Sequence, residues 1–149
     1  MSHSLNFETQ INDVEALVRA LLRVERPKGT KCFTRNQIEI HEKASMMKTY
    51  QGINLREANV IIRQRDIGLS NDIGFVKEST GFYTGVIDSY QGYDEPWLTR
   101  LYTYYNVEKS KIELEKKGIK YTEDKDEKGR IRIKARFATE KTERIKSRL

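Results

Sequence analysis

The chain has 149 residues, of which 37% are hydrophobic and 34% charged, with 28 Lys and Arg against 22 Asp and Glu for a net charge of +6. This composition excludes a membrane-spanning helix, because the longest apolar runs, such as Val60, Ile61 and Ile62, fall far short of the roughly 18 to 20 residues that a bilayer requires. The length fits one domain, since single domains run to about 100–150 residues, and five Phe, eight Tyr and one Trp argue against disorder.

The N-terminal part of the sequence predicts one strand followed by one helix. Mostly apolar side chains alternate with polar ones over 5–11, which is the period of a half-buried strand. Asn12 and Glu15 fit a capping box, in which each side chain accepts a hydrogen bond from the other residue's backbone N–H. Apolar residues recur at helical spacing over 14–22, and the helix is expected to end before Pro27.

The middle third predicts strands separated by turns. Four segments are rich in β-branched and aromatic residues: 38–40, 58–65, 72–77 and 82–87. Turn residues lie between them, at Gly52, around Gly68 and at Gly81. Because the intervening segments are short, we expect these strands to form an antiparallel meander.

A long helix is predicted over 94–118. Acidic residues and Pro96 stand in its first turn, where both are favourable, and Gly118 fits a left-handed C-terminal cap. Its apolar side chains recur at helical spacing at Leu98, Leu101, Tyr105 and Ile112.

The sequence closes on a predicted hairpin, with strands at 119–121 and 130–137 around a polar turn at 123–129. One face of the last strand is apolar and carries Ile131, Ile133, Ala135 and Phe137. The other face carries Arg130, Arg132, Lys134 and Arg136. The turn superficially resembles a calcium loop, but Lys128 and Ala135 stand where that loop needs oxygen ligands.

These elements follow the order β-α-β-β-β-β-α-β-β. Helices that separate groups of antiparallel strands indicate an α+β protein. We therefore expect a single two-layer sandwich, with a mainly antiparallel sheet and two helices on one of its faces. The expected domain covers 1–137, and 138–149 is expected to be a basic C-terminal tail or a short helix.

Several short segments resemble a family of cyanobacterial and plastid proteins, hypothetical chloroplast reading frame thirty-five, also called domain of unknown function twelve fifty-seven. The resemblance rests on Met1-Ser2-His3, Thr9-Gln10-Ile11, Tyr50-Gln51-Gly52, Asp72-Ile73-Gly74-Phe75, Trp97, Gly118-Ile119 and the strand from Gly129 to Ile133. It implies a compact α+β fold and a cytoplasmic or, in a plastid, stromal setting. It assigns no reaction, cofactor or catalytic residue.

Positive charge is the most informative feature of the sequence. Residues 130–149 contain eight cations and two anions, so they account for the whole net charge of +6. Such a row of cations suits the phosphates of a nucleic acid, an acidic protein surface, or a solvated sheet face that merely prevents edge-to-edge pairing. The predicted partner-binding or nucleic-acid-binding residues are Arg130, Arg132, Lys134, Arg136, Lys141, Arg144 and Arg148.

Two tyrosines of the long helix form a second candidate surface. Together with Trp97, the residues Tyr102, Tyr104 and Tyr105 cannot all face the same way at 3.6 residues per turn, and Leu101 and Tyr105 point with the apolar stripe. At least one of Tyr102 and Tyr104 is therefore expected to be partly exposed, either as an isolated surface aromatic or as a partner surface.

Metal and catalytic signatures are not recognisable. His3, His41 and Cys32 have no metal-ligand spacing, and only His3 belongs to a segment that carries the family resemblance. Asp66, Asp72 and Asp88 lie near strand ends, where acidic residues commonly cap or turn. We therefore predict no metal, no cofactor and no enzymatic activity.

The sequence thus predicts a non-enzymatic binding or adaptor module that docks an acidic partner through its basic C-terminal strand and tail. A sequence-nonspecific protein that binds RNA or DNA backbones is the alternative, and an enzyme of unknown class is the weaker one. A homodimer is a further hypothesis. The single cysteine and the lack of a signal-like N-terminus predict a cytoplasmic location without a membrane partner.

Overall fold

The computed structural model describes residues 4–29 and 31–136, and the chain divides into two compact units, Met1–Tyr105 and Asn106–Leu149. The first unit contains a five-stranded sheet and the second a two-stranded sheet. Helix α3 (Glu95–Lys116) contributes to both units. The predicted α+β class is confirmed. The predicted domain boundary at residue 137 lies next to the last described residue and stays a prediction, and the predicted tail lies outside the described residues.

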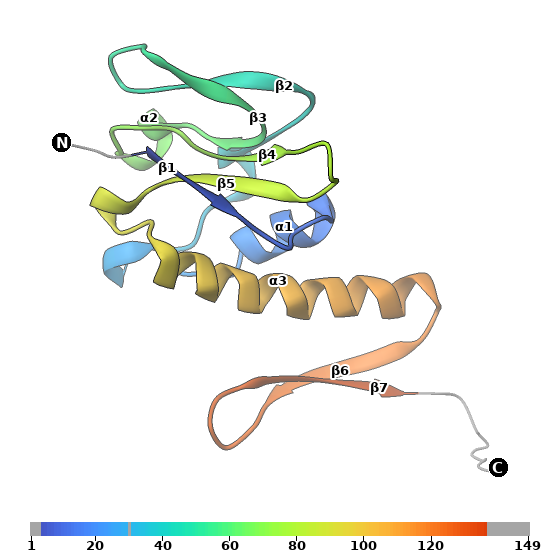
Figure 1. The fold of residues 1–149 in the computed structure, drawn as a ribbon. Coiled ribbons are helices and arrows are strands. Elements are labelled where there is room, and N and C mark those ends of the chain that lie inside the picture. Colours follow the sequence, from blue (N-terminus) through green and yellow to red (C-terminus); the bar gives the residue numbers. More distant parts are fainter. Residues whose placement is uncertain (1–3, 30, 137–149) are drawn as a thin grey trace, which may run out of the picture. The chain divides into compact units, whose positions relative to one another are not determined.

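The sheet of the first unit is antiparallel throughout, with the strand order β1-β5-β4-β3-β2 (Figure 1). Its strands are β1 (Ser4–Glu8), β2 (Ile38–Lys48), β3 (Asn54–Ile62), β4 (Ile73–Lys77) and β5 (Tyr83–Asp88). Strands β2 to β5 form the meander that the sequence predicted. Strands β4 and β5 are almost completely buried, because both faces of the sheet are covered.

The β2–β3 hairpin curls over one face of this sheet (Figure 1). A register shift between Ile40 and Ser45 interrupts the pairing of the two strands, and irregularities of this kind bend and twist a strand. The end of the hairpin returns to the sheet, where Thr49 forms an isolated bridge with Asn71. The hydrophobic cluster on this face consists of Met47, Ala58, Ile61, Val76 and Val86.

Helix α1 (Val14–Leu21) and the first turns of α3 cover the opposite face (Figure 1). The two helices are joined by Tyr105, which is 1% exposed. Its hydroxyl accepts hydrogen bonds from the backbone N–H groups of Asn12 and Asp13 at 3.0 and 3.1 Å and donates to the Asn12 side chain at 3.1 Å. The predicted apolar stripe of the long helix is confirmed, since Leu98, Leu101, Tyr105 and Ile112 are all buried.

The predicted capping box of α1 is wrong. Asp13 is the N-cap, and its carboxylate accepts a hydrogen bond from the backbone N–H of Ala16 at 3.2 Å. Asn12 lies one position earlier and is held by Tyr105, while Glu15 pairs with Arg19 at 2.7 Å. Asp13 therefore caps the helix, and a tertiary contact from α3 holds the residue before it.

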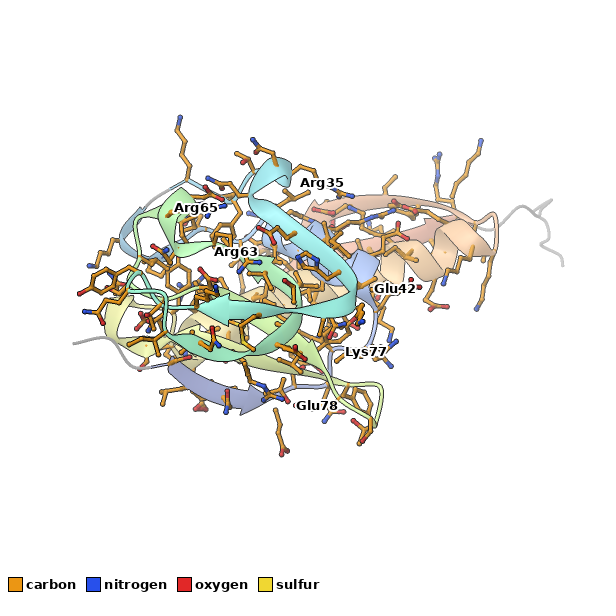
Figure 2. All side chains as sticks on the ribbon, turned by 90° about the horizontal axis from the view of Figure 1, so that it is seen from above. Arg35, Glu42, Arg63, Arg65, Lys77 and Glu78 are labelled. Carbon is orange, nitrogen blue, oxygen red and sulfur yellow. The ribbon has the colours of Figure 1, made fainter. Side chains whose placement is uncertain are left out.

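A short helix that the sequence did not predict, α2 (Gln64–Ile67), follows β3 directly. The strand predicted over 58–65 ends at Ile62, because the buried carboxylate of Asp72 accepts a hydrogen bond from the backbone N–H of Gln64 at 2.8 Å. Arg63, immediately before α2, lies beside β2 and donates to the carbonyl oxygen of Met46 at 2.9 Å (Figure 2). Short 3-10 helices occur at Pro27–Gly29, Arg35–Gln37 and Ser89–Gln91.

The second unit contains the rest of α3 and the hairpin of β6 (Lys120–Lys125) and β7 (Ile131–Arg136). Gly118 has the left-handed conformation, with a φ of 69°, that the predicted end of the helix requires. The hairpin forms its own sheet, where the sequence pattern predicted a single sheet. Among the described residues, no helix has the length and apolar composition that a membrane crossing needs.

Candidate partner-binding surface

Helix α3 and the β6–β7 hairpin are connected through one face of the hairpin. Tyr121 donates a hydrogen bond from its hydroxyl to Glu115 at 2.6 Å, and the ammonium of Lys111 contacts Glu123 at 3.1 Å. Tyr121 and Glu123 pair with Ala135 and Ile133 across the ladder, and directly opposed residues share a face. The helix therefore contacts the face that carries the half-buried apolar residues of β7.

The pKa of Lys111 is raised by this arrangement. Burial lowers the pKa, but hydrogen bonds to Glu123 and Glu108 more than offset that effect. Glu108 itself is only 3% exposed and lies 3.1 Å from the Lys111 ammonium. Lys111 therefore forms ion pairs with both α3 and β6. Because α3 contacts the face of the hairpin that carries Glu123, the opposite face is the exposed one.

The opposite, charged face of the hairpin is formed by three cross-strand pairs, Lys120 with Arg136, Thr122 with Lys134 and Asp124 with Arg132. All of these side chains are exposed. The predicted alternation of the last strand is confirmed, since Arg132, Lys134 and Arg136 are exposed while the residues between them are half-buried. The face carries both signs of charge. Its acids lie at the end next to the turn, where they are paired with arginines, and its other end carries cations.

Acids neutralise the end of this face next to the turn. Arg132 donates two hydrogen bonds to the Asp124 carboxylate, from Nε at 2.8 Å and from Nη2 at 3.0 Å. These bonds lower the pKa of Asp124. Asp126 accepts hydrogen bonds from the backbone N–H and the Nε of Arg130, at 2.8 and 2.7 Å, and its pKa is lowered mainly by the backbone bond. The sequence predicted Arg130 and Arg132 as partner contacts, and the structure has each paired with an acid of its own hairpin.

The other end of the face is cationic, and we call Lys120, Lys134 and Arg136 the basic end. Within the described part of the chain, none of the three forms a salt bridge, although the charge of Lys134 contributes to the lowered pKa of Asp124. Lys120 and Arg136 are directly opposed, and like charges in that position destabilise a sheet. A shallow hollow of about 420 Å³ lies beside this end, lined by Glu115, Gly118, Ile119, Lys120, Tyr121 and Arg136.

Lys120 is the residue that the sequence prediction missed. The alternation of Ile119 and Tyr121 puts Lys120 on the charged face, but only the register shows that it opposes Arg136. Lys134 and Arg136 were both predicted and are brought together with Lys120. The remaining predicted cations, Lys141, Arg144 and Arg148, lie outside the described residues.

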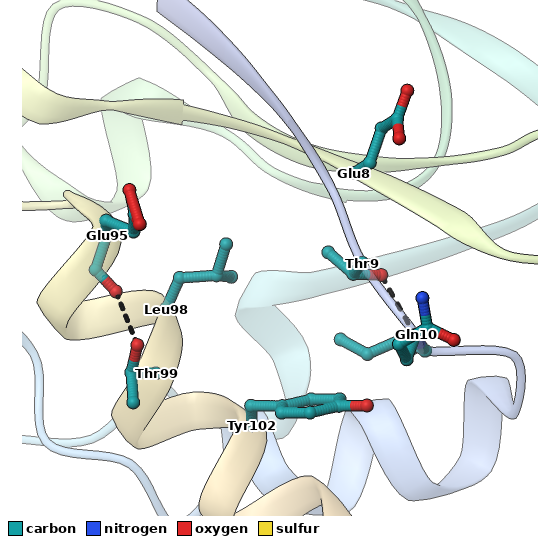
Figure 3. Close-up of a pocket in the computed structure, with 8 residues that line it drawn as sticks. Glu8, Thr9, Gln10, Glu95, Leu98, Thr99 and Tyr102 are labelled. Atoms are coloured by element: carbon teal, nitrogen blue, oxygen red, sulfur yellow. Dashed lines mark hydrogen bonds between the residues drawn. The ribbon is translucent and has the colours of Figure 1, made fainter.

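The two predicted tyrosines lie in the first unit, and both are half-buried. The ring of Tyr102 stacks on that of Tyr105 with centroids 5.8 Å apart, and the guanidinium of Arg23 lies 5.0 Å from the centroid of the Tyr104 ring. Tyr102 also lines a mainly apolar groove of about 220 Å³ between β1 and α3 (Figure 3). The hydroxyls of Thr9 and Thr99 in this groove already donate to main-chain oxygens of Tyr83 and Glu95.

A larger polar groove of about 550 Å³ lies at the curled end of the β2–β3 hairpin. Its deepest carboxylate, Asp72, is 3% exposed and accepts from the Arg63 guanidinium and from the backbone N–H groups of Lys48 and Gln64, at 2.8 to 2.9 Å. Arg63 also makes two hydrogen bonds to Glu39, at 2.9 and 3.0 Å. These bonds hold the side chains of Asp72, Arg63 and Glu39 in place, so the network has a structural role.

Potential metal ligands are dispersed in the structure. Among residues 4–29 and 31–136, no group of three or more His, Cys, Asp and Glu residues is arranged to hold a metal ion. The Cys32 thiol donates to the carbonyl oxygen of Arg23 at 3.2 Å, and His41 contacts Glu39 at 2.8 Å. His3 lies outside the described residues.

Comparisons of the chain with protein-family models, with curated proteins and with solved structures gave no match. The resemblance to the chloroplast reading-frame family therefore stays a prediction.

Proposed function

We propose that the protein is a non-enzymatic binding module that docks an acidic segment of a partner protein onto its basic end. The observation that carries the proposal is the uneven charge along one sheet face: among the described residues, Lys120, Lys134 and Arg136 form no salt bridge, whereas Arg132 is neutralised by Asp124. An incoming carboxylate would relieve the repulsion between Lys120 and Arg136.

The same face favours an acidic protein over a nucleic-acid backbone. Each phosphate that a protein neutralises adds to its affinity for a nucleic-acid backbone, and the described face presents only three cations without a salt bridge, while Lys141, Arg144 and Arg148 lie outside the described residues. Asp124 and Asp126 lie further along the hairpin, and each neutralises an arginine there, so the row of cations that a phosphate chain could follow is interrupted. The described charged face has no aromatic side chain on which a base could stack.

Polar side chains in the grooves of the first unit form hydrogen bonds within the chain, and this also supports a binding module over an enzyme. In the two grooves described above, the hydroxyls of Thr9 and Thr99 and the carboxylate of Asp72 are engaged in hydrogen bonds within the chain. A general acid or base needs a proton-transfer partner within reach and a pKa suited to the task. The Asp72 carboxylate, with three donors around it, suits a structural role better.

The proposal includes a cytoplasmic setting, or a stromal one if the family resemblance holds. A homodimer remains a hypothesis that measurement of the mass in solution tests directly, by light scattering across a range of protein concentrations. A concentration-dependent doubling of the mass would support it, and a constant monomer mass would contradict it.

Binding to defined probes tests the proposed function. A fluorescent polyglutamate peptide, a DNA duplex and a single-stranded RNA of similar charge are titrated with the protein at low ionic strength, and anisotropy is recorded. We expect the peptide to bind and its affinity to fall as salt is added, because exposed ion pairs are screened. Tighter binding of either nucleic acid would favour the alternative function, and failure of the peptide to bind at low salt would contradict the proposal.

A further inference from the structure

The ladder register determines which residues of β7 point their backbone N–H and C=O groups away from β6, toward the outer edge of the hairpin. In the register that continues the β6–β7 ladder, Asp126 opposes Arg130, and the N–H of Asp126 donates to the carbonyl oxygen of Arg130 at 2.9 Å. Because hydrogen-bonded and non-hydrogen-bonded pairs alternate in an antiparallel ladder, the even-numbered residues of β7 face β6. The backbone groups of Ile131, Ile133 and Ala135 therefore point to the outer edge.

Among the described residues, this edge has no further strand beside it, since the sheet consists of β6 and β7 alone. A two-stranded sheet is only marginally stable by itself, and an unpaired edge is a template for another strand. Backbone groups at such an edge can take up an extended peptide, with side-chain pockets or charges supplying the specificity. The edge of β7 is therefore suited to receive a strand.

Charge determines which strand the edge can accept. A second β7 strand would bring its own arginines and lysine close to Arg132, Lys134 and Arg136, so pairing of two copies through this edge is disfavoured. A strand with acidic residues on that face would instead place each carboxylate beside a cation. The same cations thus exclude one class of strand and select the other.

The apolar residues of β7 indicate which side chains the other face of an added strand would carry. Ile133 and Ala135 are half-buried on the opposite face, so a strand that alternates acidic and apolar residues would match both faces of β7. In an added antiparallel strand, the residues opposite Lys134 and Arg136 would occupy non-hydrogen-bonded pairs. Side chains are closest in such pairs, which favours contact between the opposite charges.

We propose that the outer edge of β7 takes up an extended, acidic segment of a partner protein as an antiparallel third strand. The acidic side chains of that segment lie beside Lys134 and Arg136, and its apolar side chains lie beside Ile133 and Ala135. This inference rests on the function proposed above and specifies the conformation of the partner. It predicts that backbone hydrogen bonds, and not charge alone, hold the segment.

The test uses a short synthetic peptide of alternating Glu and Val residues and two N-methylated versions of it. In the proposed strand the N–H groups of the Val residues donate to β7, whereas those of the Glu residues point away from it. Methylation of the Val nitrogens should weaken binding by at least about tenfold, and methylation of the Glu nitrogens should have a much smaller effect. The unmodified peptide should also slow amide exchange at Ile131, Ile133 and Ala135 by at least about tenfold.

The outcomes separate the two proposals. Equal binding of the Val-methylated and Glu-methylated peptides would overturn strand addition, and it would leave the proposed function intact if substitution of Lys134 and Arg136 still abolishes binding. Failure of all three peptides to bind at low salt would overturn both proposals. Because the modification is made in the peptide, the folding of the protein is the same in every arm.

Discussion

Arg132 and Asp124 form a two-bonded ion pair across the β6–β7 ladder, with N···O distances of 2.8 and 3.0 Å. The pair divides the charged face of the hairpin. On the turn side of it Arg130 is also paired with an acid, and on the other side Lys120, Lys134 and Arg136 form the basic end. The position of one aspartate therefore determines how many cations the hairpin offers to a partner.

Removal of that aspartate's charge is expected to strengthen binding of an acidic peptide. In Asp124→Asn the guanidinium of Arg132 loses its ionic partner and extends the cationic surface toward the turn. We expect the dissociation constant of a polyglutamate peptide to fall by about twofold to tenfold at low salt. Fluorescence anisotropy titration measures the change.

The matched control is Glu15→Gln, which makes the same charge change on α1, where Glu15 pairs with Arg19 at 2.7 Å. It should leave the affinity close to that of the wild type. If both variants strengthened binding equally, net charge alone would explain the effect and the location of the surface would be refuted.

Loss of the buried Asp72 carboxylate is expected to destabilise the first unit. In Asp72→Ala the guanidinium of Arg63 and the backbone N–H groups of Lys48 and Gln64 lose their shared acceptor. Removing one partner of a buried ion pair costs about 3–5 kcal/mol, because the other charge is left uncompensated. The free energy of unfolding in urea measures the loss.

The control for that experiment is Asp66→Ala, since Asp66 is exposed and its carboxylate lies 3.9 Å from Arg65. Its free energy of unfolding should change by no more than about 0.5 kcal/mol. A similar loss of unfolding free energy in the two variants would show that the buried Asp72 network does not stabilise the hairpin.

Glu39 is expected to make stability dependent on acid pH. Burial raises its pKa, but hydrogen bonds from Arg63 and His41 outweigh that effect and leave the pKa below its ordinary value of 4.5. A carboxyl group with a lowered pKa in the folded state stabilises the fold above its unfolded pKa, and this contribution disappears as the pH falls through the folded pKa. Glu39→Gln should therefore be less stable than the wild type at neutral pH, by up to about 1 kcal/mol.

Unfolding curves for the wild type and Glu39→Gln should converge as the pH is lowered through the folded-state pKa of Glu39, which lies below 4.5. Urea midpoints measured at several pH values between neutrality and that point test the prediction. A difference that stayed constant over the whole range would mean that the Glu39 carboxylate makes no charge-dependent contribution.

Alanine substitutions at Gly74 and Gly85 test how tightly the sheet is packed at two positions. A Cβ at Gly74 would lie 2.7 Å from the Met47 sulfur and 2.9 Å from the carbonyl oxygen of Val60, whereas a Cβ at Gly85 would have its nearest neighbour at 3.5 Å. Overpacking of this kind costs about 1–3 kcal/mol. Gly74→Ala should therefore lower the midpoint of thermal unfolding clearly, and Gly85→Ala should change it little. Equal midpoints would contradict the close approach of the curled hairpin to β4.

The sequence could predict those features that depend on local period. The alternation from Ile131 to Arg136 fixed the two faces of the last strand, and the spacing of Leu98, Leu101 and Tyr105 fixed the buried stripe of α3. Both patterns follow from backbone geometry, which is the same wherever the element lies in the fold.

Features that depend on register or on distant contacts could not be predicted. The pairing of Arg132 with Asp124 requires the ladder to be aligned as it is, and a shift of one residue would have paired other side chains. Likewise, the local pattern did not show that Tyr105, far away in the sequence, bonds Asn12, and the helix is capped by Asp13 instead. The sequence shows which cations exist, and only the register shows which of them have acidic partners.

The central claim, that the basic end is the docking surface, is tested most directly by two double variants with the same change of charge. Lys134→Gln with Arg136→Gln removes two cations of the basic end, and Arg130→Gln with Arg132→Gln removes two that are paired with Asp126 and Asp124. The dissociation constant of a polyglutamate peptide is measured for both. We expect the first variant to weaken binding by at least about tenfold and the second by less than about threefold. Equal weakening by the two variants would contradict the claim.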